Sequence, residues 1–485
     1  MTPKNRVTRR RSARRAILPA ALRIFWVSLF CAFFGMLIGP VVTFSPSDDR
    51  GTANAVAHKP ATTAPEDAPT SSIPVDSWET AIRALRSDYY PADIDGARAR
   101  TLTYQAIRGM MSSLRDPYSA YLDPAEWNRL VTMTEGQFGG IGALMERTRD
   151  GIRVARPLPG GPAEKAGVKA GDTLTAIDKQ PVKGKSLEDL GKWVEGQQGT
   201  EVLLSVMRGG TLMEFRVQRA NIEPPVVEQW MEDPAAGIGH IVLTEFNRRS
   251  ASQIEAAYRE LDKKGLKALV LDLRFNPGGL LDAAVDVASQ FVPENTARSL
   301  NNNVVIIRHA DGEEEGLPIQ PRSLLGKKIP LAVLVNGSSA SAAEIVIGAL
   351  RDYGVAEVIG ERTFGKGKVQ TLFEMNHGRD GGIRLTTSLY FPPKGYDINF
   401  KHDDDGNRIP DTGGIVPDIH VDALQNWTSD FEDRKNDRQL ACAVEFLRRR
   451  LAGRNPAEAA SDVAAVYQTP TRTARGNAHS QFSGE

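Results

Sequence analysis

Hydrophobic residues recur along the chain with two periods, and these periods divide it into segments. Between residues 77 and 130 they follow helical spacings, interrupted by the Asp-Pro pairs at Asp116 and Asp123. From Gly136 to about Ala220, short strand-like runs alternate with turn residues. The first segment is therefore expected to be helical and the second mostly β. In the second segment, strands are expected at Ile152–Ala155, Thr173–Ile177, Val202–Arg208 and Met213–Gln218. Helices are expected from Pro162 and over Leu187–Val194.

From about Ile241 onward, strand-like and helix-like segments alternate. Ala268–Leu273 and Leu331–Val335 are continuous apolar runs, the pattern of strands buried on both faces. Helices are expected after them, over Leu280–Phe291 and Ala342–Tyr353. This alternation predicts a mostly parallel sheet covered by helices. The remaining expected elements are strands at Ile241–Phe246, Val355–Ile359, Val369–Phe373 and Ile383–Tyr390, a helix from Ser250 to near Gly265, a terminal helix over 429–452 and a disordered tail of about thirty residues.

An uninterrupted apolar stretch lies near the N-terminus. Residues 24–44 carry no charge, and about 20 apolar residues suffice to cross a bilayer. Residues 1–15 contain seven Lys and Arg side chains and no acid, which predicts a cytoplasmic arm with the rest of the chain facing outward. A signal cleaved near Ala55-Val56-Ala57 is the alternative, although that site lies far beyond the apolar run. Residues 16–44 are therefore expected to be an anchor or signal, and residues 45–74, rich in Pro, Ala, Thr and Ser, a flexible linker.

Composition narrows the chemistry. The formal net charge is +0, so the chain has no overall positive charge that would favour binding of nucleic acid. The two cysteines, Cys31 and Cys442, do not form a disulfide framework. Residues 403–407 superficially resemble a calcium loop but lack the spaced oxygens and the closing Glu, and the histidines show no metal-ligand spacing. No metal or cofactor is expected.

The first candidate catalytic loop follows a buried strand at Asp272 and ends in Gly278 and Gly279. Two glycines leave backbone N–H groups free to approach a ligand, which suits an oxyanion site. A plain strand-to-helix turn explains the same residues.

The second loop, residues 336–344, joins the next buried strand to a helix. Ser341 at the helix start has the position of a nucleophile, and the N–H of Ala342 that of an oxyanion donor. Ser341 and Glu344 also have the spacing of a capping box, which needs no catalysis.

The third loop, residues 363–370, places Lys366 between two glycines and is followed by a strand. A lysine acts as a base only if burial lowers its pKa from about 10.4 toward neutrality, and Gln370 has the position to orient the neutral amine. A solvated lysine in a flexible turn is the alternative.

Together, the order of the three loops resembles the C-terminal processing (tail-specific) peptidases. Their motifs are Asn-Pro-Gly-Gly, then Ser-Ser-Ala-Ser-Ala-Ala-Glu, then Thr-Phe-Gly-Lys-Gly-Lys-Val-Gln, and the match extends over roughly residues 75–440, including Phe-Pro-Pro at 391–393 and Gly-Ile-Val-Pro-Asp at 414–418. The resemblance implies an α/β, crotonase/Clp-protease-like core with an inserted PDZ domain. It implies that Ser341 is the nucleophile, Lys366 the general base and Gln370 its partner, with Gly278 or Gly279 and Ala342 as oxyanion donors. Gly337 departs from the larger residue common in the family, which bears on loop stiffness.

The middle segment carries its own resemblance. Phe138-Gly139-Gly140-Ile141-Gly142 is similar to the carboxylate-binding loop of PDZ domains, in which successive N–H groups capture a peptide C-terminus. A glycine-rich hairpin explains these five residues alone, but the downstream Ala170-Gly171-Asp172-Thr173-Leu174 also matches the domain.

The resemblance implies a serine endopeptidase that cleaves proteins near their C-termini, held in the bacterial inner membrane by a single span with its catalytic part in the periplasm. Its partners would be protein substrates, and in some relatives an adaptor or a second copy. A catalytically inactive PDZ scaffold or peptide-binding protein is the alternative, and an acyl-CoA enzyme of crotonase type would leave the PDZ segment unexplained. The expected division is a basic arm (1–15), anchor or signal (16–44), linker (45–74), helical domain (75–135), PDZ domain (136–220), protease core (221–428) and C-terminal helix with tail (429–485).

Overall fold

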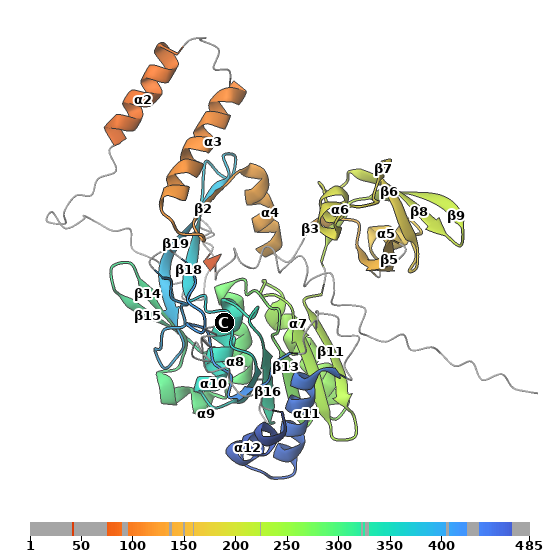
Figure 1. Ribbon diagram of the computed structural model, residues 1–485, viewed down its shortest axis with the longest axis vertical. Coiled ribbons are helices and arrows are strands. Elements are labelled where there is room, and N and C mark those ends of the chain that lie inside the picture. Colours follow the sequence, from red (N-terminus) through yellow and green to blue (C-terminus); the bar gives the residue numbers. More distant parts are fainter. Residues whose placement is uncertain are drawn as a thin grey trace, which may run out of the picture. The chain divides into compact units, whose positions relative to one another are not determined.

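The computed structural model describes residues 41–42, 75–89, 96–134, 138–148, 151–158, 160–223, 225–321, 324, 329–403, 407–423 and 436–467 (Figure 1). The predicted arm and linker, most of the predicted anchor, Asp404–Gly406 and the tail from residue 468 lie outside these residues; Val41–Val42 form strand β1. Among the described residues, no helix is long and apolar enough to cross a membrane. These residues form two compact units, one of 75–128 with 371–386, and one of 129–370 with the chain from Thr387.

A six-stranded sheet forms the centre of the larger unit. Its strand order is β11-β12-β13-β16-β17-β20, and every pair is parallel except β11 with β12. All residues of β12, β13 and β16 are buried, as expected for continuous apolar runs covered on both faces. The predicted, mostly parallel sheet is confirmed. The strands are β11 (Val227–Asp233), β12 (Ile238–Leu243), β13 (Ala268–Asp272), β16 (Leu331–Val335), β17 (Ala356–Gly360) and β20 (Ile419–His420).

Helices cover both faces of this sheet. Helices α11 (Arg438–Leu451) and α12 (Pro456–Tyr467), drawn in blue in Figure 1, pack against the face that carries Val270 and Leu334. Neighbouring residues of a strand face opposite sides, so the equally buried Leu269 and Leu271 face the other layer. That layer contains α7 (Ser250–Lys263), α8 (Leu281–Phe291) and α10 (Ala342–Asp352), with α8 packed against both others.

The prediction that the last thirty or so residues are disordered is wrong for Pro456–Tyr467, which form helix α12. Its first residue is Pro456, whose fixed φ suits the first turn of a helix, and the segment is rich in alanine. Only Ala459 and Val463, four residues apart, are fully buried in it, and both join the core under α11. Two small side chains give a weak periodic pattern, although they are sufficient to dock the helix.

A second, antiparallel arrangement accounts for the two strands predicted after residue 368. Strands β18 (Lys368–Glu374) and β19 (Gly382–Phe391) are neighbours in a sheet continued by β14 (Asn303–His309) and β15 (Glu314–Pro318). The last residues of β19 pair with β14, with Tyr390 opposite Ile307. These strands are therefore not part of the parallel sheet, and β14 and β15 were not predicted. Short helices α9 (Glu294–Ala297) and η2 (Arg298–Leu300) precede β14.

The segment predicted to be PDZ-like has its own sheet, of order β4-β5-β6-β8-β9 with β7 beside β6. A separate core joins Met145, Leu190 and Leu204 from strands and helix α6. Ser186 caps α6 because its hydroxyl accepts the N–H of Asp189, while the Asp189 carboxylate accepts the N–H of Ser186. The elements are β3 (Phe138–Gly140), β4 (Ala143–Thr148), β5 (Gly151–Pro157), α5 (Pro162–Lys165), β6 (Thr173–Ile177), β7 (Gln180–Pro181), α6 (Leu187–Val194), β8 (Glu201–Arg208), β9 (Thr211–Gln218) and β10 (Ala220–Ile222), the last pairing with β3.

The smaller unit is built on helices, as predicted. Strand β2 (Ala120–Leu122) pairs antiparallel with the first residues of β19, with Tyr121 opposite Ile383. The Tyr121 hydroxyl donates to the Asp380 carbonyl at 2.8 Å, and the guanidinium of the buried Arg384 donates to the Tyr118 carbonyl at 2.9 Å. The helices are α2 (Val75–Ser87), α3 (Gly96–Ser113) and α4 (Pro124–Thr134), the last continuing into the larger unit.

Helix α12 offers a matched test of this packing. Val463 is fully buried and Val466, in the same helix, is 67% exposed. Truncating the buried valine removes core contacts and leaves a cavity, so Val463→Ala should lower the free energy of unfolding by about 1–3 kcal/mol. Val466→Ala should change it by less than about 0.5 kcal/mol. Urea titration followed by circular dichroism measures both; equal effects of the two substitutions would contradict docking of α12.

Candidate active site

Three loops leave neighbouring strands at the same edge of the parallel sheet. Strands β13, β16 and β17 are adjacent and parallel, and each loop follows the carboxyl end of one of them. Ligand sites of open α/β sheets lie outside the carboxyl ends of their strands. The fold thus gathers the glycine loop (273–280), the serine loop (336–341) and the lysine loop (361–367), which lie far apart in sequence.

The serine loop holds Ser341 in a strained conformation. Ser341 precedes α10 with φ 59° and ψ −118°, and its side chain is fully buried. A non-glycine residue rarely adopts such a φ, and conformations of this kind cost on the order of 1–3 kcal/mol. Strain persists only where surrounding contacts fix the backbone, and it concentrates at functional sites.

The glycine loop packs directly against the serine loop. A Cβ on Gly278 would lie 2.7 Å from the Ser341 Cβ and 2.9 Å from the Ala342 nitrogen, so no side chain fits there. A Cβ on Gly279 would lie 2.0 Å from the Phe246 carbonyl oxygen. Both glycines are therefore required by close backbone approach.

Hydrogen bonds hold the backbone around both glycines. The N–H of Gly278 donates to the Asn276 side-chain oxygen at 2.9 Å. The buried Asn276 side chain is itself held because its amide donates to the Leu243 carbonyl at 2.8 Å. The backbone of Phe246 bonds the Gly278 carbonyl and the Leu280 N–H, at 2.9 and 2.8 Å, on either side of Gly279.

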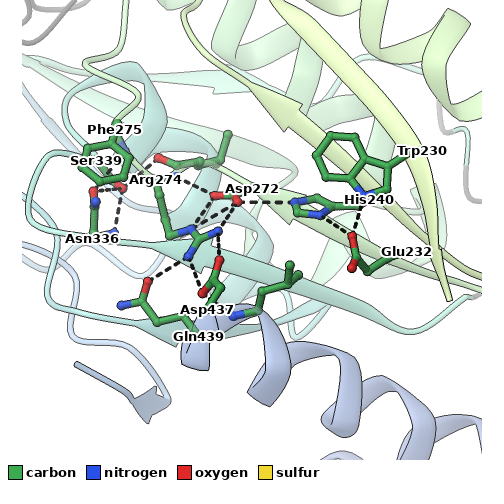
Figure 2. Close-up of polar contacts among 12 residues, drawn as sticks. Trp230, Glu232, His240, Asp272, Arg274, Phe275, Asn336, Ser339, Asp437 and Gln439 are labelled. Carbon is green, nitrogen blue, oxygen red and sulfur yellow. Dashed lines mark hydrogen bonds and ion pairs between the residues drawn. The ribbon is translucent and has the colours of Figure 1, made fainter. Parts of the chain in front are cut away.

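Cross-links between the glycine and serine loops appear in Figure 2. The Phe275 N–H donates to the Asn336 side-chain oxygen at 3.0 Å, and the Ser339 hydroxyl donates to the Leu273 carbonyl at 2.8 Å. The Ala340 N–H donates to the Asn276 carbonyl at 2.9 Å. These hydrogen bonds therefore join the two loops to each other.

A buried ionic network fixes the glycine loop from behind. The Arg274 guanidinium contacts Asp272 at 2.6 Å and Asp437, the N-cap of α11, at 2.9 Å (Figure 2). It also donates to the Gln439 side chain at 3.1 Å. Arg274 and Asp272 have fully buried side chains, and such charges require partners of this kind. The C-terminal helices are thereby tied to the loop that bears Gly278.

His240 extends this network along the sheet. Its Nε2 lies 3.3 Å from Asp272 and its Nδ1 lies 3.4 Å from Glu232 (Figure 2). Its ring packs against Trp230 with the two ring planes tilted by 54°. Burial lowers the pKa of His240, but hydrogen bonds and charge from Asp272 and Glu232 outweigh it and leave the pKa raised. For Asp272, burial raises the pKa, and the Arg274 charge and the His240 hydrogen bond together lower it well below its usual range.

The lysine loop buries its central side chain. Lys366 is 1% exposed, and Gln370 on β18 is fully buried. Gly365 has φ 91°, and a Cβ there would lie 2.7 Å from the Gly414 nitrogen. The Gly-Ile-Val-Pro-Asp segment thus packs against this loop, and the alternative of a solvated lysine in a flexible turn is wrong for this structure.

The Glu344 carboxylate joins the lysine loop to the serine loop. Its Oε2 accepts the backbone N–H groups of Ser341 and Lys366, each at 2.9 Å. Its Oε1 accepts the Thr363 hydroxyl at 2.6 Å and the Gly365 N–H at 2.7 Å. Burial raises the pKa of Glu344, and these four hydrogen bonds oppose the rise. Ser341 and Lys366 therefore share a single oxygen atom as hydrogen-bond acceptor.

The structure brings most of the predicted site residues together. Ser341, Ala342, Gly278, Gly279 and Lys366 meet at this edge of the sheet. The predicted PDZ residues Phe138–Gly142 belong to the separate PDZ-like segment, directly before β4. The Ser341-x-x-Glu344 spacing indicates Glu344 only as a cap of α10, and no local sequence pattern predicts its bond to the Lys366 N–H.

Comparison with known proteins agrees with this arrangement. Residues 237–421 match the family described as peptidase family S41, and residues 153–208 match the PDZ domain. A "Probable CtpA-like serine protease" of Staphylococcus aureus (strain MRSA252) is 35% identical over 346 residues, 71% of this chain and 64% of the relative. A protein of the same description from Staphylococcus haemolyticus is 36% identical over 348 residues, 72% of this chain and 64% of the relative. The chain thus spans less than two thirds of these relatives.

Among solved structures, the photosystem II D1 C-terminal processing protease is 30% identical, with a TM-score of 0.39; the alignment covers 78% of this chain and 92% of that protein. The two sequence matches fall on the parts of the chain that hold the three loops and the separate β-rich core. The chain belongs to peptidase family S41, carries a PDZ domain, and is a member of the C-terminal processing peptidases.

Proposed function

We propose that this protein is a serine endopeptidase that cleaves protein substrates near their C-termini, with Ser341 as nucleophile and Lys366 as general base. The observation that carries the proposal is the Glu344 carboxylate, which accepts the backbone N–H groups of both residues and so holds the two backbones close together. Both side chains are buried. The S41 match and the description of the staphylococcal relatives as serine proteases support it.

In the proposed reaction, the neutral amine of Lys366 takes the proton of the Ser341 hydroxyl as the oxygen bonds to the peptide carbonyl carbon. Burial disfavours the charged form of an amine, and Lys366 is 1% exposed. The protonated lysine then gives its proton to the leaving amine, and the peptide C–N bond breaks. Water, deprotonated by Lys366, hydrolyses the acyl-serine. Gln370 orients the lysine in this proposal.

For the oxyanion, we favour Gly279 over Gly278 as the partner of Ala342. The Gly278 N–H is already committed to the Asn276 side chain at 2.9 Å. Ala342 is the first residue of α10, where N–H groups have no partner within the helix. Each such N–H group stabilises the negatively charged transition state, and removing a single oxyanion donor costs about 3–4 kcal/mol in related enzymes.

The PDZ domain is proposed to present substrate tails through residues 138–142. These residues precede β4, which shares a core with α6, and a PDZ ligand adds as a strand beside such a helix. We also propose a single N-terminal membrane span with the catalytic part in the periplasm, on the basis of the basic arm and the apolar stretch at 24–44.

Ser341→Ala and Lys366→Ala should each abolish cleavage of a protein with an unstructured, apolar C-terminal tail, because each removes one partner of the proton transfer. Lys368→Ala, two residues away on β18, is the matched control and should keep activity within about twofold of native. Mass spectrometry of the products measures cleavage. A Lys366→Ala variant that cleaves at the native rate would contradict the assignment, and tail binding by a native protein that never cleaves would favour the inactive scaffold.

Glu344→Gln should lower both activity and stability. A glutamine has one acceptor oxygen, so its amide nitrogen would face two of the four donors now bound. Unpaired buried donors cost about 1–3 kcal/mol each, and kcat should fall at least about tenfold as the loops separate. Glu361→Gln, which affects a single bond to the Ala423 N–H, should leave kcat near native. Steady-state kinetics and thermal unfolding of both variants decide; a native kcat in Glu344→Gln would refute the tether.

A further inference from the structure

The hydroxyl of Tyr390 lies between the two proposed catalytic residues. Tyr390 is fully buried near the end of β19. Its Oη lies 2.9 Å from the Ser341 carbonyl oxygen and 2.5 Å from the Lys366 carbonyl oxygen. Its backbone N–H donates to the Gly367 carbonyl at 2.9 Å, which fixes the tyrosine against the lysine loop. One phenolic proton therefore serves two carbonyl acceptors.

This contact complements that of Glu344. Glu344 accepts the N–H groups of Ser341 and Lys366, and Tyr390 donates toward the C=O groups of the same two residues. The strained backbone of Ser341 is thus fixed at its N–H by Glu344 and at its carbonyl by Tyr390. The same carbonyl also accepts the Ile345 N–H at 3.1 Å. A conformation with φ 59° and ψ −118° is retained only under such constraint.

We propose that Tyr390 is a positioning residue for the reaction: its hydroxyl holds the Ser341 and Lys366 backbones at the separation that proton transfer requires. The inference rests on the proposed function of these two residues. Without the hydroxyl, two carbonyl oxygens face each other across a buried space with no proton between them. Their dipoles repel, and the two loops move apart. A displacement of about 1 Å between reacting groups can cost roughly a hundredfold in rate.

Helix α10, which follows Ser341, provides a matched control at its other end. Tyr353 caps the other end of α10, and its buried hydroxyl donates to the Asn303 carbonyl at 2.9 Å and lies 3.3 Å from the Leu300 carbonyl. Tyr353→Phe removes the same chemical group from the same kind of contact, at the end of α10 that Ser341 does not occupy. The two phenylalanine variants therefore separate a general loss of packing from a loss of positioning.

The test is steady-state cleavage of a tail-bearing protein by full-length native protein, Tyr390→Phe and Tyr353→Phe, with thermal unfolding of each. Tyr390→Phe should lower kcat by about 10- to 100-fold with KM within about twofold. Tyr353→Phe should lower Tm comparably and leave kcat within about twofold. The inference is overturned if kcat falls equally in both variants, or if KM of Tyr390→Phe rises while kcat stays native.

Two further measurements complete the test. Amide hydrogen exchange over residues 336–348 and 361–370 in a Ser341→Ala background should increase on adding Tyr390→Phe and not on adding Tyr353→Phe; unchanged exchange would overturn the inference even for a poorly expressed variant. Ser341→Ala and Lys366→Ala are assayed in parallel. If they retain activity, the proposed function fails; if they are inactive while Tyr390→Phe has native kcat, only the role of Tyr390 fails.

Discussion

The buried carboxylate of Glu344 is the constraint on which the arrangement of the site depends. A carboxylate removed from water is costly unless its oxygens are bonded, and here four donors surround it. Those donors come from both sides of the site, so satisfying the charge requires the serine and lysine loops to meet. Tyr390 meets the same two residues through their carbonyl groups. The position of Lys366 relative to Ser341 is thus a consequence of satisfying buried polar groups.

The sheet supplies the rest of the geometry. Adjacent parallel strands β13, β16 and β17 deliver three loops to one edge, and the glycines allow their backbones to touch. Behind the glycine loop, Arg274 joins Asp272 to Asp437 at the start of α11 (Figure 2). Removing one partner of a buried ion pair leaves the other charge unpaired and destabilises the protein by about 3–5 kcal/mol. The C-terminal helices therefore contribute to the precision of the site as well as to the core.

Much of this could be predicted from the sequence because it is written in local patterns. The continuous apolar runs at 268–272 and 331–335 identify buried strands, and the three small-residue loops between elements identify the site. Other features are not local. The Ser341-x-x-Glu344 spacing predicts a helix cap, but it contains no information about a partner 22 residues away at Lys366. Similarly, β19 has a strand pattern that does not reveal its antiparallel partner β14.

In the proposed mechanism, Ser341 carries the acyl group during cleavage. The most direct measurement is peptide mapping by mass spectrometry of full-length protein, quenched in acid during turnover of an activated peptide ester. We expect one acyl group, on the peptide that contains Ser341, and none in Ser341→Ala. Turnover with the acyl group on another residue, or with none detectable while a burst of product is released, would contradict it.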